Sequence, residues 1–128
     1  MKVFRQIGAE FVDDRGAMTH LLDDGRTTIK SILLITSKAG SVRANHYHKT
    51  DFHYCYLIKG RMEYIEQPVG ADESTRQSVI LETGDMVYTD PMVMHAMRFL
   101  EDSAFFAFAK QSRHQAAYEE DTVRVSLV

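Results

Sequence analysis

Most of the chain is a succession of short runs of β-forming residues, separated by turn residues. Residues 30–36 (KSILLIT) form a continuous apolar run, which predicts a strand buried on both faces. Residues 52–59 and 61–66 are almost unbroken β-formers on either side of Gly60, so they predict a hairpin. Residues 67–76 contain turn-forming and acidic side chains and predict a loop.

The pattern of short strands continues through the rest of the chain. Short strands at this spacing are typical of an all-β sandwich or small barrel with few or no helices. The 128 residues show no repeat and no linker, so we expect one domain spanning residues 1–128. Further strands are predicted at residues 78–81, 86–89, 95–100, 104–109 and 123–127, with one helical turn at residues 115–120.

The histidines are the most informative polar residues. His46 and His48 are two apart, so on a strand both imidazoles leave the same face. His53 follows a polar break, and His95 follows a turn forced by Pro91. These segments hold four of the six histidines, which predicts one shared site, while His20 and His114 are expected at the surface.

The first histidine segment resembles the first motif of the cupin superfamily, G-x5-H-x-H-x4-E-x6-G. Gly40, His46, His48 and Gly60 stand at matching spacing, and His53 stands where the family has glutamate. The resemblance implies a double-stranded β-helix, or jelly-roll barrel, with one divalent transition metal in its interior. By this resemblance the metal ligands are His46, His48, His53 and His95.

The second histidine segment is similar to the second cupin motif. Gly84, Asp85, Pro91 and His95 are in register, whereas Met92 replaces the usual glycine after the proline. If His53 is not a ligand, we expect it to orient another imidazole. Imidazole suits several ions, so the sequence leaves iron, zinc, nickel and manganese open.

A narrower resemblance lies inside the first motif. Residues 42–49 are similar to the segment of cupin-type nucleotide-sugar epimerases and ketoisomerases that carries the catalytic histidine, and residues 11–16 resemble their Asp-x-Arg-Gly strand. The likeness implies that His46 is a proton-transfer base and that Arg43 and Arg15 face the diphosphate or the sugar. Those enzymes usually work without a metal, so the two resemblances imply different chemistry.

Strand alternation indicates which side chains share the pocket. If His53 points inward, Cys55 and Leu57 do so too, and we expect Cys55 to be a small buried hydrophobe. An aromatic outer face of this kind predicts a homodimer interface. The residues expected on that face are Phe52, Tyr54, Tyr56 and Ile58.

The same alternation on the second motif places His95, Met97 and Phe99 on one face. With several methionines nearby, we expect a soft apolar lining around a polar centre, as in many small-molecule sites. Met97 and Tyr88 are candidate substrate contacts, and Tyr88 or Tyr64 is a candidate proton donor on the rim. The methionines expected near the pocket are Met86, Met92 and Met94.

Composition narrows the partners. The net charge of -3 and the scattered basic residues argue against a nucleic-acid surface and favour a small or anionic ligand. No stretch approaches the roughly 20 apolar residues of a membrane span, and the N-terminus lacks the apolar core of a signal peptide. A single cysteine agrees with a reducing compartment, so we expect a cytoplasmic protein.

Three functions follow from these features. The first is a metal-dependent enzyme acting on a small oxygenated metabolite, either a dioxygenase with iron(II) or a Lewis-acid isomerase with zinc or nickel. The second is an epimerase or ketoisomerase of a nucleotide-linked keto-sugar, with His46 as the base. The third is a module that binds or senses a small ligand without turnover, because a fold does not imply a reaction.

Overall fold

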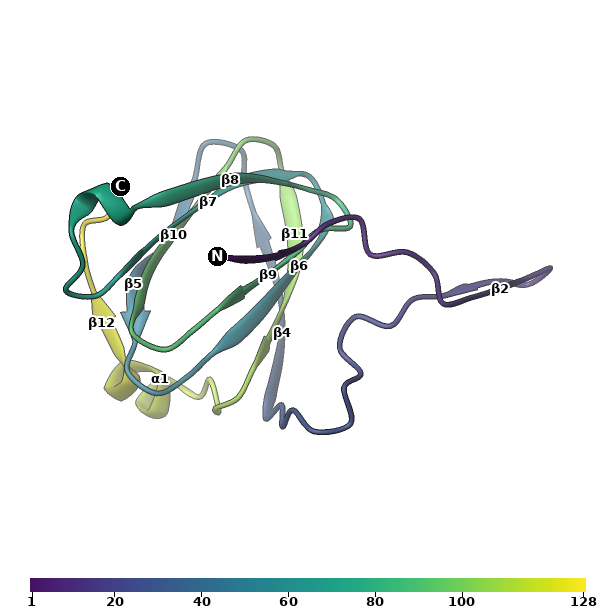
Figure 1. Ribbon diagram of the computed structural model, residues 1–128, viewed down its shortest axis with the longest axis horizontal. Helices are drawn as coiled ribbons and strands as arrows, with labels where there is room; N and C mark the ends of the chain where they lie inside the picture. Colours follow the sequence, from purple (N-terminus) through teal and green to yellow (C-terminus); the bar gives the residue numbers. More distant parts are fainter.

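The computed structural model describes residues 1–128 and shows two facing five-stranded antiparallel sheets that form a small barrel (Figure 1). The first sheet has the order β1 (Lys2–Phe4), β9 (Met86–Thr89), β6 (His53–Lys59), β11 (Ser103–Ala109) and β4 (Ser31–Ser37). The second sheet has the order β12 (Thr122–Arg124), β5 (Val42–His48), β10 (Val93–Phe99), β7 (Arg61–Pro68) and β8 (Gln77–Glu82).

Inward-facing side chains divide the barrel interior into an apolar part and a polar part. Along β6, His53, Cys55 and Leu57 are buried in alternation, which confirms the predicted phase of this strand. Along β10, the inward-facing residues run from His95 to Phe99, and both of these are buried. The apolar core therefore occupies the end of the barrel beyond the histidines and holds them on a rigid frame. Its largest members are Leu57, Met62, Tyr64, Leu81, Phe99 and Phe105.

The edge strand β4 differs from its prediction. The apolar run predicts a strand that is buried on both faces, but the side chains of Ile32 and Leu34 are each 64% exposed. Their side chains lie on the outer face of the first sheet, which no layer covers in this chain. Only the alternate residues of β4, including Ile35, pack inward against the core.

Two smaller elements lie outside the sheets. The hairpin of β2 (Phe11–Asp13) and β3 (Gly16–Met18) projects away from the barrel (Figure 1). The helix α1 (Gln115–Asp121), predicted as a single turn, lies at the end of the barrel where β5 ends and β6 begins (Figure 1). A 3-10 turn, η1 (Glu73–Thr75), occupies the predicted loop.

Both helical elements are too short to cross a membrane.

Candidate functional site

A β-bulge on β5 turns the first two histidines inward. Ala44 and Asn45 both have left-handed backbone conformations, with φ of 67° and 53°. His46 pairs with His95, but the next partner of β10 is Ala44, so Asn45 is the extra residue. The Asn45 side chain accepts hydrogen bonds from the backbone N–H groups of residues 127 and 128, which stabilises the bulge.

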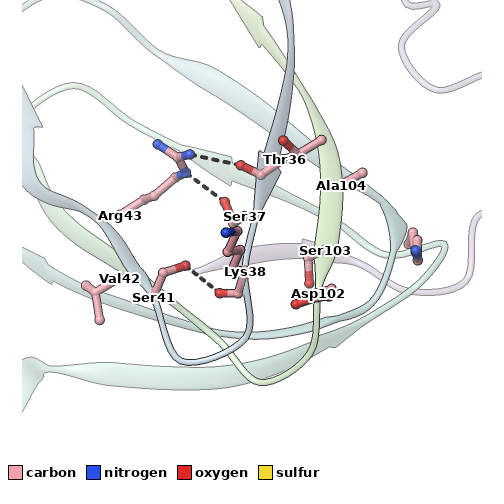
Figure 2. A pocket seen from close by; sticks show the side chains of 10 residues that line it. Thr36, Ser37, Lys38, Ser41, Val42, Arg43, Asp102, Ser103 and Ala104 are labelled. Atoms are coloured by element: carbon pink, nitrogen blue, oxygen red, sulfur yellow. Dashed lines mark hydrogen bonds between the residues drawn. The ribbon is translucent and has the colours of Figure 1, made fainter.

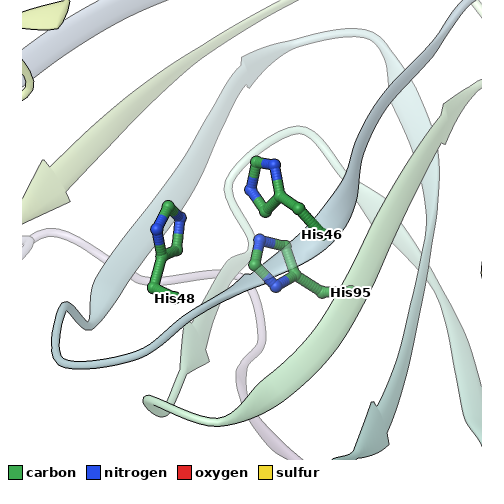
Figure 3. Close-up of side chains that lie close together, drawn as sticks. All are labelled: His46, His48 and His95. Atoms are coloured by element: carbon green, nitrogen blue, oxygen red, sulfur yellow. The ribbon is translucent and has the colours of Figure 1, made fainter. Parts of the chain in front are cut away.

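Three histidines meet inside the barrel (Figure 3). One ligand-capable atom from each of His46, His48 and His95 lies within 4.8 Å of the other two. All three residues are buried, and Nδ1 of His46 and Nε2 of His48 have no hydrogen-bond partner. Buried polar atoms without partners are rare, so these nitrogens are candidates for binding a ligand or an ion.

His53 contacts this group through His95. The Nε2 atoms of the two rings are 3.2 Å apart, and Nδ1 of His95 lies 3.0 Å from the Val93 carbonyl. Because a carbonyl can only accept, Nδ1 of His95 carries the proton and its Nε2 accepts from His53. Nδ1 of His53 then accepts from the Cys55 thiol at 3.3 Å.

Burial keeps all four imidazoles neutral. It lowers the pKa of His46 to about 2, of His48 to about 3 and of His95 to about 4, and neighbouring positive charges such as that of Arg113 add to the shift. Burial and His95 also hold the pKa of His53 well below its usual value. A neutral imidazole is the form that binds a metal or takes up a proton.

An inner cavity of about 140 Å³ opens beside the histidines. Its lining includes His46, His53, His95 and Met97, and also Arg113 and Tyr118 from the segment that follows β11. Neither Arg113 nor Tyr118 is among the site residues that the sequence predicts. Both lie in the polar tail, and no pattern in the sequence indicates that the tail folds back over the barrel.

An outer pocket of about 660 Å³ lies where the end of β4 meets the start of β5 (Figure 2). Lys38, Arg43 and Lys59 line it together with hydroxyl side chains. Arg43 donates to Ser37 Oγ at 2.6 Å and to the Thr36 carbonyl at 2.9 Å. Arg43 also lines the inner cavity, so its side chain borders both spaces.

Two predicted substrate contacts lie elsewhere in this chain. Tyr88 is on the outer face of the first sheet, where its ring packs 4.8 Å from that of Tyr54 and lies under the Lys2 ammonium. Arg15 lies between β2 and β3 in the projecting hairpin, where it forms an ion pair with Asp13. Neither side chain lines the inner cavity. Tyr64 is not on a rim, because it is fully buried and its hydroxyl bonds Glu66 and Thr89.

The expected methionine lining is largely wrong. Met97 lines the inner cavity, but Met86, Met92 and Met94 do not. Met92 is 45% exposed in the turn before His95, where its backbone has a left-handed φ of 62°. The rest of the apolar lining from the two sheets comes from β4, β5, β6 and β11, namely Ile35, Ala44, Cys55, Phe105 and Ala107.

Two groups of side chains bring possible metal ligands together, and only the first of them has donor atoms that suit a divalent metal. Neutral imidazoles at His46, His48 and His95 suit a borderline transition metal, and His46 and His48 each offer an unpartnered nitrogen, whereas His95 would have to release its bond from His53 to bind an ion. His48 also lies near Asp51 and Asp121, but these carboxylates are already occupied. They accept from the backbone N–H and hydroxyl of Thr50 and the backbone N–H of Gln111, and Asp51 pairs with Arg113.

Comparison with known proteins gives one family and several similar folds. The model of the family described as Polysaccharide biosynthesis C-terminal domain matches residues 11–123. No curated protein matches the chain by sequence.

Solved structures with this fold include a 3,4-ketoisomerase from Helicobacter canadensis, with a TM-score of 0.76 and 20% identity over 96% of this chain and 89% of that one. A dTDP-4-dehydrorhamnose 3,5-epimerase from Sulfolobus tokodaii has a TM-score of 0.73 and 21% identity over 91% and 73%. The capsular polysaccharide assembling protein CapF from Staphylococcus aureus has a TM-score of 0.68 and 20% identity over 91% and 31%.

Proposed function

Because the chain belongs to the polysaccharide biosynthesis C-terminal domain family and has the cupin fold, we propose that it is an epimerase or ketoisomerase of a nucleotide-linked keto-sugar. Two of the similar structures are named as a 3,4-ketoisomerase and a dTDP-sugar 3,5-epimerase. Their likeness supports the sugar hypothesis over a dioxygenase.

One observation carries this proposal. His46 is a neutral imidazole whose Nδ1 is buried without a partner, and it lines a cavity that shares the lining residue Arg43 with a basic pocket. The inner cavity, at about 140 Å³, is comparable in volume to a single sugar ring, and the outer pocket, at about 660 Å³, is several times larger. We therefore assign the keto-sugar to the inner space and the nucleoside diphosphate to the outer one.

The proposed chemistry begins with proton transfer at the carbon next to the sugar carbonyl. His46 takes this proton, the C–H electron pair forms a carbon–carbon double bond, and the carbonyl π pair moves to oxygen. Returning the proton to the other face of the same carbon gives epimerisation. Returning it to the former carbonyl carbon, with loss of the neighbouring hydroxyl proton, moves the ketone by one position.

The pKa of His46, lowered to about 2 by burial, requires help from the substrate. A base works best when its pKa lies near the operating pH. The negative charge of the diphosphate, and then of the enediolate, would raise the pKa of His46 in the complex. Proton uptake would thus be coupled to the presence of the anionic substrate.

Solvent exchange tests the proposal. The protein is incubated in D₂O with keto-sugar nucleotides, beginning with TDP-4-keto-6-deoxyglucose, and deuterium incorporation is followed by NMR. We expect exchange by the wild type, none by His46→Asn, and wild-type exchange by His20→Asn, whose side chain is exposed. A wild type that binds these nucleotides without exchange would contradict the proposal and favour a binding module without turnover.

A second candidate function is supported by the three-histidine cluster. His46, His48 and His95 would hold one divalent transition metal, which would act as a Lewis acid toward the ketone. CapF, one of the similar folds, was also solved with the inhibitor 3-isopropenyl-tropolone, and tropolones chelate metals through adjacent oxygens. Against this candidate, no carboxylate compensates the ion among these three ligands, and Arg113 lines the same cavity.

Elemental analysis of protein purified without a histidine tag separates the two candidates. Near one equivalent of iron, zinc, nickel or manganese, lost in His46→Ala and kept in His114→Ala, would support the metal function. Exchange that survives complete chelation would support the metal-free one.

A further inference from the structure

We propose that Arg113 is a catalytic residue of the keto-sugar reaction, with its guanidinium holding the substrate carbonyl oxygen and stabilising the enolate that forms when His46 removes the neighbouring proton. This inference rests on the proposed function.

Arg113 reaches the inner cavity from the segment between β11 and α1. Its side chain is only 13% exposed, and it lines the same space as His46, His53 and His95. Both Nε and Nη2 are buried without a hydrogen-bond partner. An unpaired buried donor on a charged group is costly, so its presence here indicates a group that pairs with a ligand.

The guanidinium is held in place by contacts that leave Nε free. Nη2 lies 3.0 Å from Asp51 Oδ2, a close ion pair that lacks hydrogen-bond alignment. Asp51 is itself fixed, because its Oδ1 accepts the Gln111 backbone N–H at 2.9 Å. On the other side the Tyr118 ring lies 5.4 Å from the guanidinium carbon.

Three other polar residues of the cavity already have hydrogen-bond partners within the protein. His53 and His95 bond one another, and His95 also donates to the Val93 carbonyl. Arg43 donates to two groups of β4. The fully buried side-chain atoms of the lining that have no hydrogen-bond partner are Nδ1 of His46 and Nε and Nη2 of Arg113. They form a base and an electrophile that face one cavity.

This pair matches what enolisation requires. As His46 accepts the proton, the C–H electron pair forms the carbon–carbon double bond and the carbonyl π pair moves to oxygen, where a preorganised cation stabilises the negative charge. The guanidinium donates hydrogen bonds throughout and gives up none of its own protons in the step. The step needs no oxidant or reductant.

The test compares Arg113→Gln, Arg113→Lys and the double variant Asp51→Asn/Arg113→Gln. The double variant removes the buried carboxylate that the single change would leave unpaired, so it separates catalysis from folding. Arg124→Gln is the matched control, because Arg124 lies at the same end of the barrel, is exposed and pairs with Glu119. Each protein is assayed for deuterium exchange, TDP affinity and thermal unfolding.

We expect Arg113→Gln and the double variant to lose about 100-fold or more in the exchange rate at saturating substrate. Their TDP affinity should stay within threefold of wild type, because the diphosphate binds in the outer pocket. Arg113→Lys should keep part of the rate, and added guanidinium should partly rescue an Arg113→Ala variant.

Wild-type exchange in the double variant would overturn the role of Arg113 and leave the proposed function intact. A rate loss that follows unfolding and is reversed by Asp51→Asn would assign Arg113 a structural role instead. Absence of exchange in the wild type would remove the proposed function and this inference together.

Discussion

Nε2 of His53 lies 3.2 Å from Nε2 of His95, across the interior between the two sheets. This contact forms a chain of neutral groups that runs from the Cys55 thiol through both imidazoles to the Val93 carbonyl. Every donor in the chain has an acceptor, so the network is stable only while both rings are uncharged. His53, which stands where cupins have glutamate, is therefore suited to orienting His95.

The neutral histidines predict a loss of stability in mild acid. Burial lowers the pKa of His48 to about 3 and of His95 to about 4, against 6.5 in the unfolded chain. Below pH 6.5 the unfolded state then binds more protons, so the free energy of unfolding falls as the pH falls toward 4. Each such histidine should contribute a loss of about 1.4 kcal/mol between pH 7.5 and 5.5.

Urea unfolding at these two pH values, in the presence of a chelator, measures this loss. His114→Asn should show the wild-type dependence, because His114 is exposed. A free energy that is unchanged between pH 7.5 and 5.5 would mean that the imidazoles are not kept neutral.

The same network predicts an inert cysteine. Cys55 is 1% exposed, and burial raises the pKa of its thiol to about 12. A thiol reagent should therefore react with the native protein only through unfolding, and at once in denaturant. Rapid labelling at neutral pH without denaturant would contradict the buried, hydrogen-bonded thiol.

The spacing of the histidines was enough to predict their meeting. His46 and His48 share a face because strand side chains alternate, and the same rule placed His53 with Cys55. Alternation alone could not place Tyr88, because the register of β9 against β6 decides its face. That register pairs Tyr88 with Tyr54 on the outside.

Long-range folding set the remaining parts of the site. Arg113 reaches the cavity only because the tail returns over the barrel and Asp121 bonds Thr50. The two-residue bulge at Ala44 and Asn45 also has no glycine to signal it. Contacts of this kind depend on which distant segments meet, which local patterns do not contain.

The turn before His95 carries a strained methionine. Met92, at the position where cupins usually have glycine, adopts a φ of 62°. Left-handed backbone costs a non-glycine residue about 1 kcal/mol or more, so Met92→Gly should raise the free energy of unfolding by about 1 kcal/mol. Met18→Gly, in an exposed strand without positive φ, should not. Chemical denaturation of both variants checks the difference, and destabilisation by Met92→Gly would show that the side chain matters more than the backbone.

The outer face of the first sheet predicts a homodimer. Rows of apolar side chains cross it in register, with Ile32 opposite Phe108 and Phe108 opposite Tyr54. Ile32 and Leu34 remain 64% exposed on this face, a large uncovered apolar area for a small protein. We expect a dimer in solution by light scattering, and a monomer for the double variant Ile32→Asp/Leu34→Asp. Leu100→Asp, an exposed change outside this face, should leave the dimer intact.

The outer pocket predicts how the diphosphate is held. Lys38, Arg43 and Lys59 place three positive charges around this space, and Asp102 opposes them while accepting the Ala39 backbone N–H. Arg43→Gln should therefore weaken TDP binding by about tenfold, since a charge-assisted hydrogen bond contributes about 1.5 kcal/mol. It should also reduce the salt dependence of binding.

Calorimetric titration with TDP at two salt concentrations measures both effects. Arg61→Gln is the control, because Arg61 is exposed, lies outside both cavities and pairs with Glu82. Equal weakening by the two variants would mean that TDP responds to net charge rather than to this pocket. Weakening by Arg43→Gln alone, with slow exchange in Arg113→Gln, would assign binding to one arginine and turnover to the other.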